Sequence, residues 1–167
     1  MILVYKNGLL KYKSKIYRCS LGKNGLTTAK IEGDGCTPIG SFALGPIYFR
    51  SDRIKKINTL LKKNTIDKSM YWSDYPESIH YNKLINFRDK SFERLYIREN
   101  IYDIILIIKY NFKPILPYKG SAIFMHIAKK NYSDTEGCIA LKKECLLEIL
   151  ESLSPKEKIK VLPSNYY

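Results

Sequence analysis

The sequence is short of several residue types, and each shortage excludes a class of structure or site. It has two histidines and four cysteines, and no two cysteines are spaced as C-x-x-C, which argues against a structural zinc site. No run of about 18 apolar residues occurs, so no transmembrane helix is expected. A chain of 167 residues can bury a sufficient core, so a disulfide framework is not expected either.

The first residues, MILVYKNGLLKYK, do not resemble a secretion signal. No basic region precedes the apolar residues, and the apolar run is too short. The segment instead predicts a strand over Ile2–Lys6, a turn at Asn7-Gly8 and a second strand. The sequence therefore does not predict export.

Acidic residues are scarce relative to basic ones, with 16 against 29, and the net charge is +13. Such a surplus favours anionic partners, namely nucleic acid, anionic lipid or an acidic polymer. An ordinary lysine-rich solvated surface explains it equally well. Neither zinc-ligand spacing nor an RNP-type aromatic pattern is present, so binding to a specific nucleic acid is not expected and stays a remote alternative.

The hydrophobic pattern predicts a mostly β protein with a single domain over residues 1–167, since no repeat or linker interrupts it. The continuously apolar run IILIIKY, residues 104–110, indicates a central strand buried on both faces. A helix is predicted over Lys142–Leu153, where Cys145 falls on the apolar face, and a shorter one over Arg53–Lys63. Residues 64–92 lack periodicity and are interpreted as a cap or as one wall of a cleft. Further strands are expected at Lys15–Leu21, Gly40–Phe49, Leu95–Ile97, Ser121–Ile127 and Lys158–Val161.

The segment SAIFMHIAKKNYSDTEGCIAL, residues 121–141, carries the clearest chemical signal. His126 ends an apolar strand-like run, and Cys138 follows Gly137 in a tight turn before a helix-like segment. A cysteine attacks as the thiolate, and its ordinary pKa of about 8.5 is lowered by a nearby imidazolium or by a helix N-terminus. A lone histidine at a strand end is more often a core residue, but a Gly-Cys pair whose cysteine follows twelve residues later favours a cysteine acyl-transfer enzyme.

The segment TAKIEGDGCTPIGSF, residues 28–42, predicts an ordered loop. Its three glycines and one proline within eight residues exclude regular structure, and long ordered loops in compact domains are commonly functional. A plain turn-rich connection between strands is the alternative. Asp34 is expected to anchor turns, while Lys30 and Glu32 are free to pair or to face a ligand.

Together these segments resemble the L,D-transpeptidase catalytic domain, also called the YkuD or ErfK family. The resemblance rests on EGDGCTPIGSF and IFMHIAKKNYSDTEGCIAL, which occur in the family's order. YWSDYPESIHYNKLI, ENIYDIILIIKYNFKP and GSAIFMH are similar to the short single-domain branch of that family. The resemblance spans roughly residues 15–165.

The resemblance implies a mostly β sandwich or open barrel with a few short helices. It implies that Cys138 is the nucleophile and His126 its general base, while the backbone N–H groups of Gly137 and Cys138 hold the oxyanion. The implied reaction forms a thioester on a peptidoglycan tetrapeptide stem, which a second stem's amine resolves as a cross-link. No cofactor or metal is implied. The alternatives are an L,D-carboxypeptidase, in which water resolves the thioester, and a catalytically silent peptidoglycan-binding module.

The resemblance also makes a substrate-binding role credible for six other residues. Four are expected to line the cleft, and two, Arg88 and Lys30, to hold substrate carboxylates. The four are Trp72, Asp74, Tyr81 and Asn82. The substrate would place the protein in the cell envelope or periplasm; with no signal peptide in the sequence, the cytoplasm stays open.

The sequence departs from the common family pattern at three positions. Glu136 replaces a histidine, Ile127 replaces a glycine and Ala140 replaces an arginine. An ionised Glu136 close to the sulfur would raise the thiol pKa. We therefore expect Glu136 to point away from Cys138 or to pair with a lysine such as Lys129.

Overall fold

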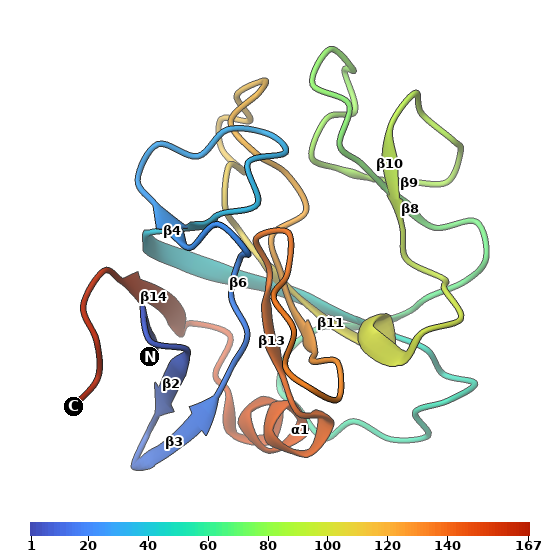
Figure 1. The fold of residues 1–167 in the computed structure, drawn as a ribbon. Coiled ribbons are helices and arrows are strands. Elements are labelled where there is room, and N and C mark those ends of the chain that lie inside the picture. Colours follow the sequence, from blue (N-terminus) through green and yellow to red (C-terminus); the bar gives the residue numbers. More distant parts are fainter.

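The computed structural model describes all residues from 1 to 167 (Figure 1). A nine-stranded sheet in the order β13-β12-β11-β6-β14-β1-β2-β3, with β7 paired to β6, forms its body. Its strands are β1 (Ile2–Tyr5), β2 (Leu9–Tyr12), β3 (Lys15–Arg18), β6 (Gly40–Phe49), β7 (Lys63–Thr65), β11 (Ile104–Ile108), β12 (Phe124–Ile127), β13 (Ile139–Leu141) and β14 (Lys158–Leu162). Two small sheets, β10-β8-β9 and β4-β5, complete the β structure. Their strands are β4 (Leu26–Thr27), β5 (Thr37–Pro38), β8 (Tyr71–Ser73), β9 (Leu84–Ile85) and β10 (Phe92–Arg94).

The two ends of the large sheet meet and almost close it into a barrel. The chain that continues from β3 pairs with β13: the Ser20 amide donates to the Ala140 carbonyl at 2.8 Å, and the Ala140 amide returns the bond at 3.0 Å. Edge strands leave unpaired backbone groups, and this pairing satisfies them at the junction. The predicted fold class, mostly β with an open barrel, is confirmed.

Strand β11 is buried on both faces, as its apolar run predicts. Ile104, Leu106 and Ile108 enter the large core inside the barrel, whereas Ile105 and Ile107 enter a second core on the opposite face. A strand covered on both sides has no position for a polar side chain, which explains the unbroken apolar run.

The helix α1 (Lys143–Ser152) closes one end of the barrel (Figure 1). It buries Leu146, Ile149 and Leu150, spaced three and one residues apart on a single helical face. The predicted carboxyl-terminal helix is confirmed, and Cys145 lies half-buried at the edge of that face. A short 3-10 helix, η1 (Asn100–Tyr102), is the other helical element, and no helix has the length and apolar character needed to cross a membrane.

The predicted helix over Arg53–Lys63 is wrong. After a turn at residues 51–53 the chain runs without regular structure, and its last residues pair with β6 as strand β7. Ile54, Ile57 and Leu61 are buried in the large core, so helix-like spacing arises here from an irregular segment. The pairing of the Ile47 amide with the Lys62 carbonyl at 2.8 Å holds this segment extended.

The strand predicted over Leu95–Ile97 is displaced by three residues. The observed strand β10 covers Phe92–Arg94, because these residues pair with β8 in antiparallel register. The small sheet β10-β8-β9 stands beside the barrel (Figure 1), and Trp72 packs edge-on against Phe124 of β12 with 5.2 Å between ring centroids. Residues 64–92 therefore form a wall against the barrel.

The two-sided burial of β11 predicts a large difference between two leucine substitutions. Leu106→Ala removes a fully buried side chain from the barrel core and is expected to lower the free energy of unfolding by about 2–5 kcal/mol. Leu60→Ala, at a side chain that is 73% exposed, should change it by less than about 0.5 kcal/mol. Urea unfolding followed by circular dichroism measures both, and equal losses would contradict the assigned core.

Candidate active site

His126 and Cys138 project from neighbouring parallel strands onto one face of the barrel. His126 lies in β12 opposite Ala140 of β13, and Cys138 comes directly before β13. Because side chains alternate along a strand, Cys138 and Ala140 share the face that His126 occupies. Both His126 and Cys138 line a cavity of about 240 Å³, which we call the His126-side cavity. The pair predicted from sequence is thus brought together.

The Cys138 sulfur is buried and held by two backbone groups. Its thiol donates to the Ala122 carbonyl at 3.2 Å and accepts a hydrogen bond from the Phe124 amide at 3.4 Å. Burial raises the pKa of the Cys138 thiol to about 12, although the Phe124 amide works in the opposite direction. The uncharged thiol is therefore the resting form.

His126 is buried and neutral as well. Burial lowers its pKa to about 4. Its Nδ1 lies 2.9 Å from the Ile127 carbonyl oxygen, a contact in which Nδ1 carries the proton and Nε2 remains free to accept one. The Tyr102 ring meets the imidazole edge-on, with 5.3 Å between centroids.

The resting pair differs from the thiolate and imidazolium expected from sequence. No hydrogen bond joins Cys138 to His126, and the helix expected to lower the thiol pKa begins only at Lys143. Residues 139–141 form strand β13 instead of a helical turn, because they pair with β12. The helix N-terminus therefore lies too far from the sulfur to act on it, since its effect is confined to about one turn.

Gly137 is required by close contact between two loops. Its φ is +132°, and a Cβ at this position would lie 2.7 Å from the Cys36 carbonyl oxygen. The Gly137 amide donates to Thr135 Oγ1 at 3.1 Å, whereas the Cys138 amide donates to no protein group. The Cys138 amide is therefore the free backbone donor next to the sulfur.

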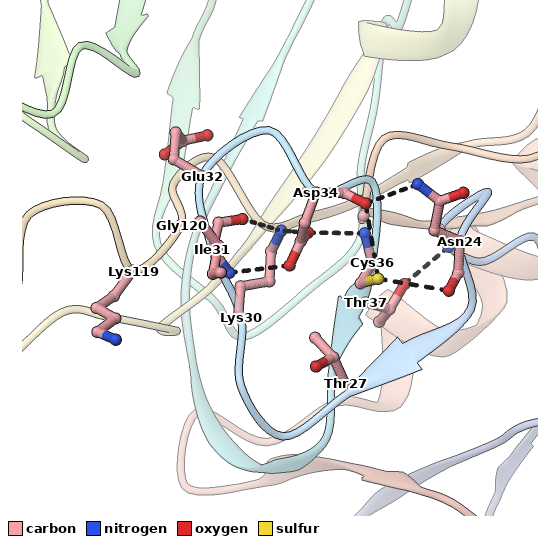
Figure 2. Close-up of polar contacts among 12 residues, drawn as sticks. Asn24, Thr27, Lys30, Ile31, Glu32, Asp34, Cys36, Thr37, Lys119 and Gly120 are labelled. Atoms are coloured by element: carbon pink, nitrogen blue, oxygen red, sulfur yellow. Dashed lines mark hydrogen bonds and ion pairs between the residues drawn. The ribbon is translucent and has the colours of Figure 1, made fainter.

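The glycine-rich loop is organised around Asp34 (Figure 2). Its carboxylate accepts hydrogen bonds from the amides of Ile31 and Cys36, both at 2.9 Å, and pairs with the Lys30 ammonium. Burial raises the Asp34 pKa, but these donors outweigh it and the pKa is lowered. The predicted anchoring role of Asp34 is what the geometry shows.

This loop forms one side of a second cavity next to Cys138. The cavity has a volume of about 230 Å³, and we call it the Lys30-side cavity. Its lining includes Lys30, Glu32, Asp74 and Ser121. Cys138 borders both cavities, together with Glu93, Tyr102 and Glu136. The sulfur thus lies where the two cavities adjoin.

The other residues predicted to bind substrate occupy three kinds of position. Lys30 and Asp74 line the Lys30-side cavity, while Arg88 is exposed and lines neither cavity. Trp72, Tyr81 and Asn82 are buried behind the site. They line neither cavity and serve as its support.

Asn82 is the centre of that support. Its Oδ1 accepts hydrogen bonds from Trp72 Nε1 at 2.9 Å and from the Ala122 amide at 3.1 Å. The Tyr81 hydroxyl accepts a bond from the Gly120 amide at 2.9 Å and donates to Glu32. These bonds hold residues 120–122 in place. The Ala122 carbonyl in this segment accepts the hydrogen bond from the Cys138 thiol.

Glu136 points to the protein surface and pairs with Lys23, with 2.8 Å between Nζ and Oε1. The expectation of a lysine partner is met, but by Lys23 and not by Lys129. The same chain segments are joined through backbone bonds, since the Lys23 amide donates to the Thr135 carbonyl at 2.8 Å.

Two residues of the site were not found from sequence. Glu93 in β10 and Tyr102 in η1 line both cavities, and burial raises the pKa of each. No motif in the sequence singled out either residue. Their place beside the sulfur becomes visible only once the small sheet and η1 pack against β12.

The family model of the L,D-transpeptidase catalytic domain, YkuD, matches residues 1–161. The chain therefore belongs to the L,D-transpeptidase catalytic domain family, as the sequence motifs predict.

The chain is also similar to a solved structure, that of the helical cell shape determining protein Pgp2 from Campylobacter jejuni. The sequence identity is 15% and the TM-score 0.46; the match covers 99% of this chain but 48% of that one. The present chain thus spans about half the length of that relative. No curated protein matches the sequence.

The contact between Gly137 and Cys36 predicts that Gly137→Ala is more harmful than an alanine elsewhere at positive φ. We expect a loss of at least 1–3 kcal/mol from backbone strain, increased by the clash with the carbonyl. Gly25→Ala is the control, because Gly25 also has a positive φ of +81° but no atom within 4 Å of the added Cβ. Urea unfolding compares them, and equal losses would show that the close approach costs nothing.

Neutral burial of His126 predicts a loss of stability in mild acid. The folded pKa of about 4 lies below the ordinary 6.5, so the unfolded chain takes up a proton first as the pH falls. The contribution is present above pH 6.5 and is lost as the pH falls towards 4, with a loss on the order of 1–2 kcal/mol between pH 6.5 and 5.0. Urea unfolding at these two pH values should show this loss in the wild type and a smaller one in His126→Gln; the same loss in both would rule out His126 as the source.

Proposed function

We propose that residues 1–167 form one catalytic domain that transfers the acyl group of a peptidoglycan tetrapeptide stem through a thioester on Cys138. The observation that carries the proposal is the placement of Cys138 and His126 on one face of adjacent strands, lining one cavity. Family membership supports the reaction class. The chemistry uses protein groups alone.

In the first step the Cys138 thiol gives its proton to His126 Nε2 as the sulfur attacks the carbonyl carbon. Because Nδ1 is already bonded to the Ile127 carbonyl, the imidazole is oriented to receive this proton. The tetrahedral intermediate then collapses, the C–N bond breaks, and His126 protonates the departing D-alanine amine. A thioester remains on Cys138.

The oxyanion of the intermediate needs backbone donors near the sulfur. The Cys138 amide is free to donate to it, and the Gly137 amide would have to leave Thr135 Oγ1 to contribute. Cys138 and His126 are both neutral at rest, and the attack creates the oxyanion and the imidazolium together. The reaction therefore depends on backbone donors that stabilise the oxyanion as it forms.

The second step determines the product. An amine from a second stem, deprotonated by His126, would give a cross-link, whereas water would give a trimmed tripeptide. We favour transpeptidation, with L,D-carboxypeptidase activity as the alternative. Action on the cell wall implies a place in the cell envelope and roles in wall biogenesis and cell shape.

The proposal predicts a complete dependence on Cys138. Incubation with tetrapeptide muropeptides should yield a thioester adduct on Cys138 and a cross-linked dimer, both detected by mass spectrometry. Cys138→Ala should abolish both, and His126→Gln should lower the rate by about 10²–10⁴-fold. Cys145→Ser is the control and should keep full activity, because Cys145 lies on α1 away from both cavities.

The products separate the alternatives. Tripeptide without dimer would identify a carboxypeptidase. Unchanged muropeptides, together with binding to cell-wall sacculi that survives Cys138→Ala, would identify a silent binding module and reject the catalytic proposal.

A further inference from the structure

The largest cavity of the protein has no part in the proposed reaction. Its volume is about 670 Å³, more than twice that of either cavity beside Cys138. Its lining comes from residues 6–9, 18–26 and 132–134, and neither His126 nor Cys138 contributes to it. We call it the Arg18 cavity and treat it as a separate site.

Arg18 is placed to bind an anion in this cavity. It lies in β3, and its guanidinium lies over the Tyr132 ring, with 4.5 Å between the guanidinium carbon and the ring centroid. No carboxylate pairs with it, so its N–H groups are available to a ligand. A guanidinium that is already oriented loses less freedom on binding, and its planar donors match a carboxylate or a phosphate bidentately.

Tyr132 supports Arg18 from an unusual backbone conformation. Its φ is +55°, in the left-handed region that bulky side chains rarely adopt. The Tyr132 amide donates to the Lys129 carbonyl at 2.9 Å, which closes the turn that holds the ring there. Strained positions of this kind are concentrated at sites that bind ligands.

Three further donors line the cavity without a protein acceptor. Ser20 is only 4% exposed, and its hydroxyl has no hydrogen-bond partner. The neighbouring Leu21 amide donates to no protein group, and Lys6 takes part in no ion pair. A buried hydroxyl without a partner is unfavourable, and an oxygen atom of a ligand would supply the missing acceptor.

The remaining charges indicate which end of the cavity takes the anion. Lys23 is neutralised by Glu136. Asp134 is the only acidic residue in the lining, and it also lines the His126-side cavity, so it marks the end nearest the catalytic pair. Lys6 belongs to the turn before β2, which is the partner strand of β3 and Arg18. An anion is therefore directed away from Asp134 and towards Lys6 and Arg18.

We infer that the Arg18 cavity binds an acidic saccharide, a sugar unit whose carboxylate or phosphate is held by Lys6, Arg18 and Ser20. The volume exceeds what a bare ion needs, and most of the lining residues are polar or glycine, which suits sugar hydroxyls better than a lipid chain. The inference stands on this cavity alone and does not rest on the proposed reaction. Combined with that reaction, the site attaches the domain to sugar strands of the wall while stems enter the cavities beside Cys138.

Isothermal titration calorimetry with the whole protein and four small probes tests the site. The disaccharide of N-acetylglucosamine and N-acetylmuramic acid carries a free carboxylate, and its methyl ester is the neutral counterpart. Glucose 6-phosphate carries a phosphate on a sugar, and inorganic phosphate supplies the anion alone. At least one acidic sugar is expected to bind about 10-fold tighter than both the ester and inorganic phosphate, because it alone engages the cationic end and the polar walls. The tighter of the two acidic sugars identifies the anion that the cavity prefers.

Two substitutions assign the binding to this cavity. Arg18→Gln should weaken it by about 10-fold or more, because it removes a charged, bidentate donor. Ser20→Ala should weaken it by about 3- to 10-fold. Because the Ser20 hydroxyl has no partner in the protein, Ser20→Ala should leave the midpoint of urea unfolding unchanged or raised, which separates a lost contact from a lost fold.

Arg98→Gln is the matched control. Arg98 is another exposed arginine without an ion pair, and it does not line the cavity, so this variant should keep the full affinity. Binding that survives Arg18→Gln and Ser20→Ala together, or that falls equally in Arg98→Gln, would overturn the inference.

The probes can overturn it as well. Equal affinity for the acidic disaccharide and its ester, with no binding of glucose 6-phosphate, would show that no anion is recognised. Equal affinity for the acidic sugars and inorganic phosphate would show an ion site without saccharide recognition. A protein that binds the acidic sugar but makes no product from muropeptides would reject the proposed reaction and support this site, and an active protein that binds neither acidic sugar would do the reverse.

Discussion

The site depends on backbone pairing between residues 20–23 and residues 135–140. The bonds between Ser20 and Ala140 close the barrel. The Thr135 amide donates to the Leu21 carbonyl and the Lys23 amide donates to the Thr135 carbonyl, which extends the pairing up to the turn that holds Cys138. Gly137 then packs directly on the Cys36 carbonyl. One continuous junction thus closes the sheet, places the sulfur next to β12, and docks the glycine-rich loop against it.

Much of this could be predicted from the sequence because some signals are local. Three features can be predicted from short stretches of sequence. They are the apolar run of β11, the amphipathic face of α1 and the Gly-Cys pair after a strand-end histidine. The helix expected over Arg53–Lys63 failed because burial of three spaced apolar residues does not require a helix. Glu93 and Tyr102 could not be found, since their positions depend on how the small sheet and η1 pack against β12, which no local pattern predicts.

The candidate substrate contacts show the same limit. Trp72 and Asn82 belong to the site only through the segment at residues 120–122 that they hold in place. The family resemblance predicted that they line the cleft, whereas they lie behind it and support its wall. The net charge misleads in a similar way, because a total of +13 describes the outer surface and the cleft beside the sulfur is acidic.

The burial of Cys138 also affects how readily its sulfur is oxidised. Peroxides attack the thiolate, and because burial raises the pKa of Cys138 well above its ordinary value, the sulfur is protonated at neutral pH. Burial therefore protects the cysteine that the proposed reaction uses from conversion to sulfenic acid.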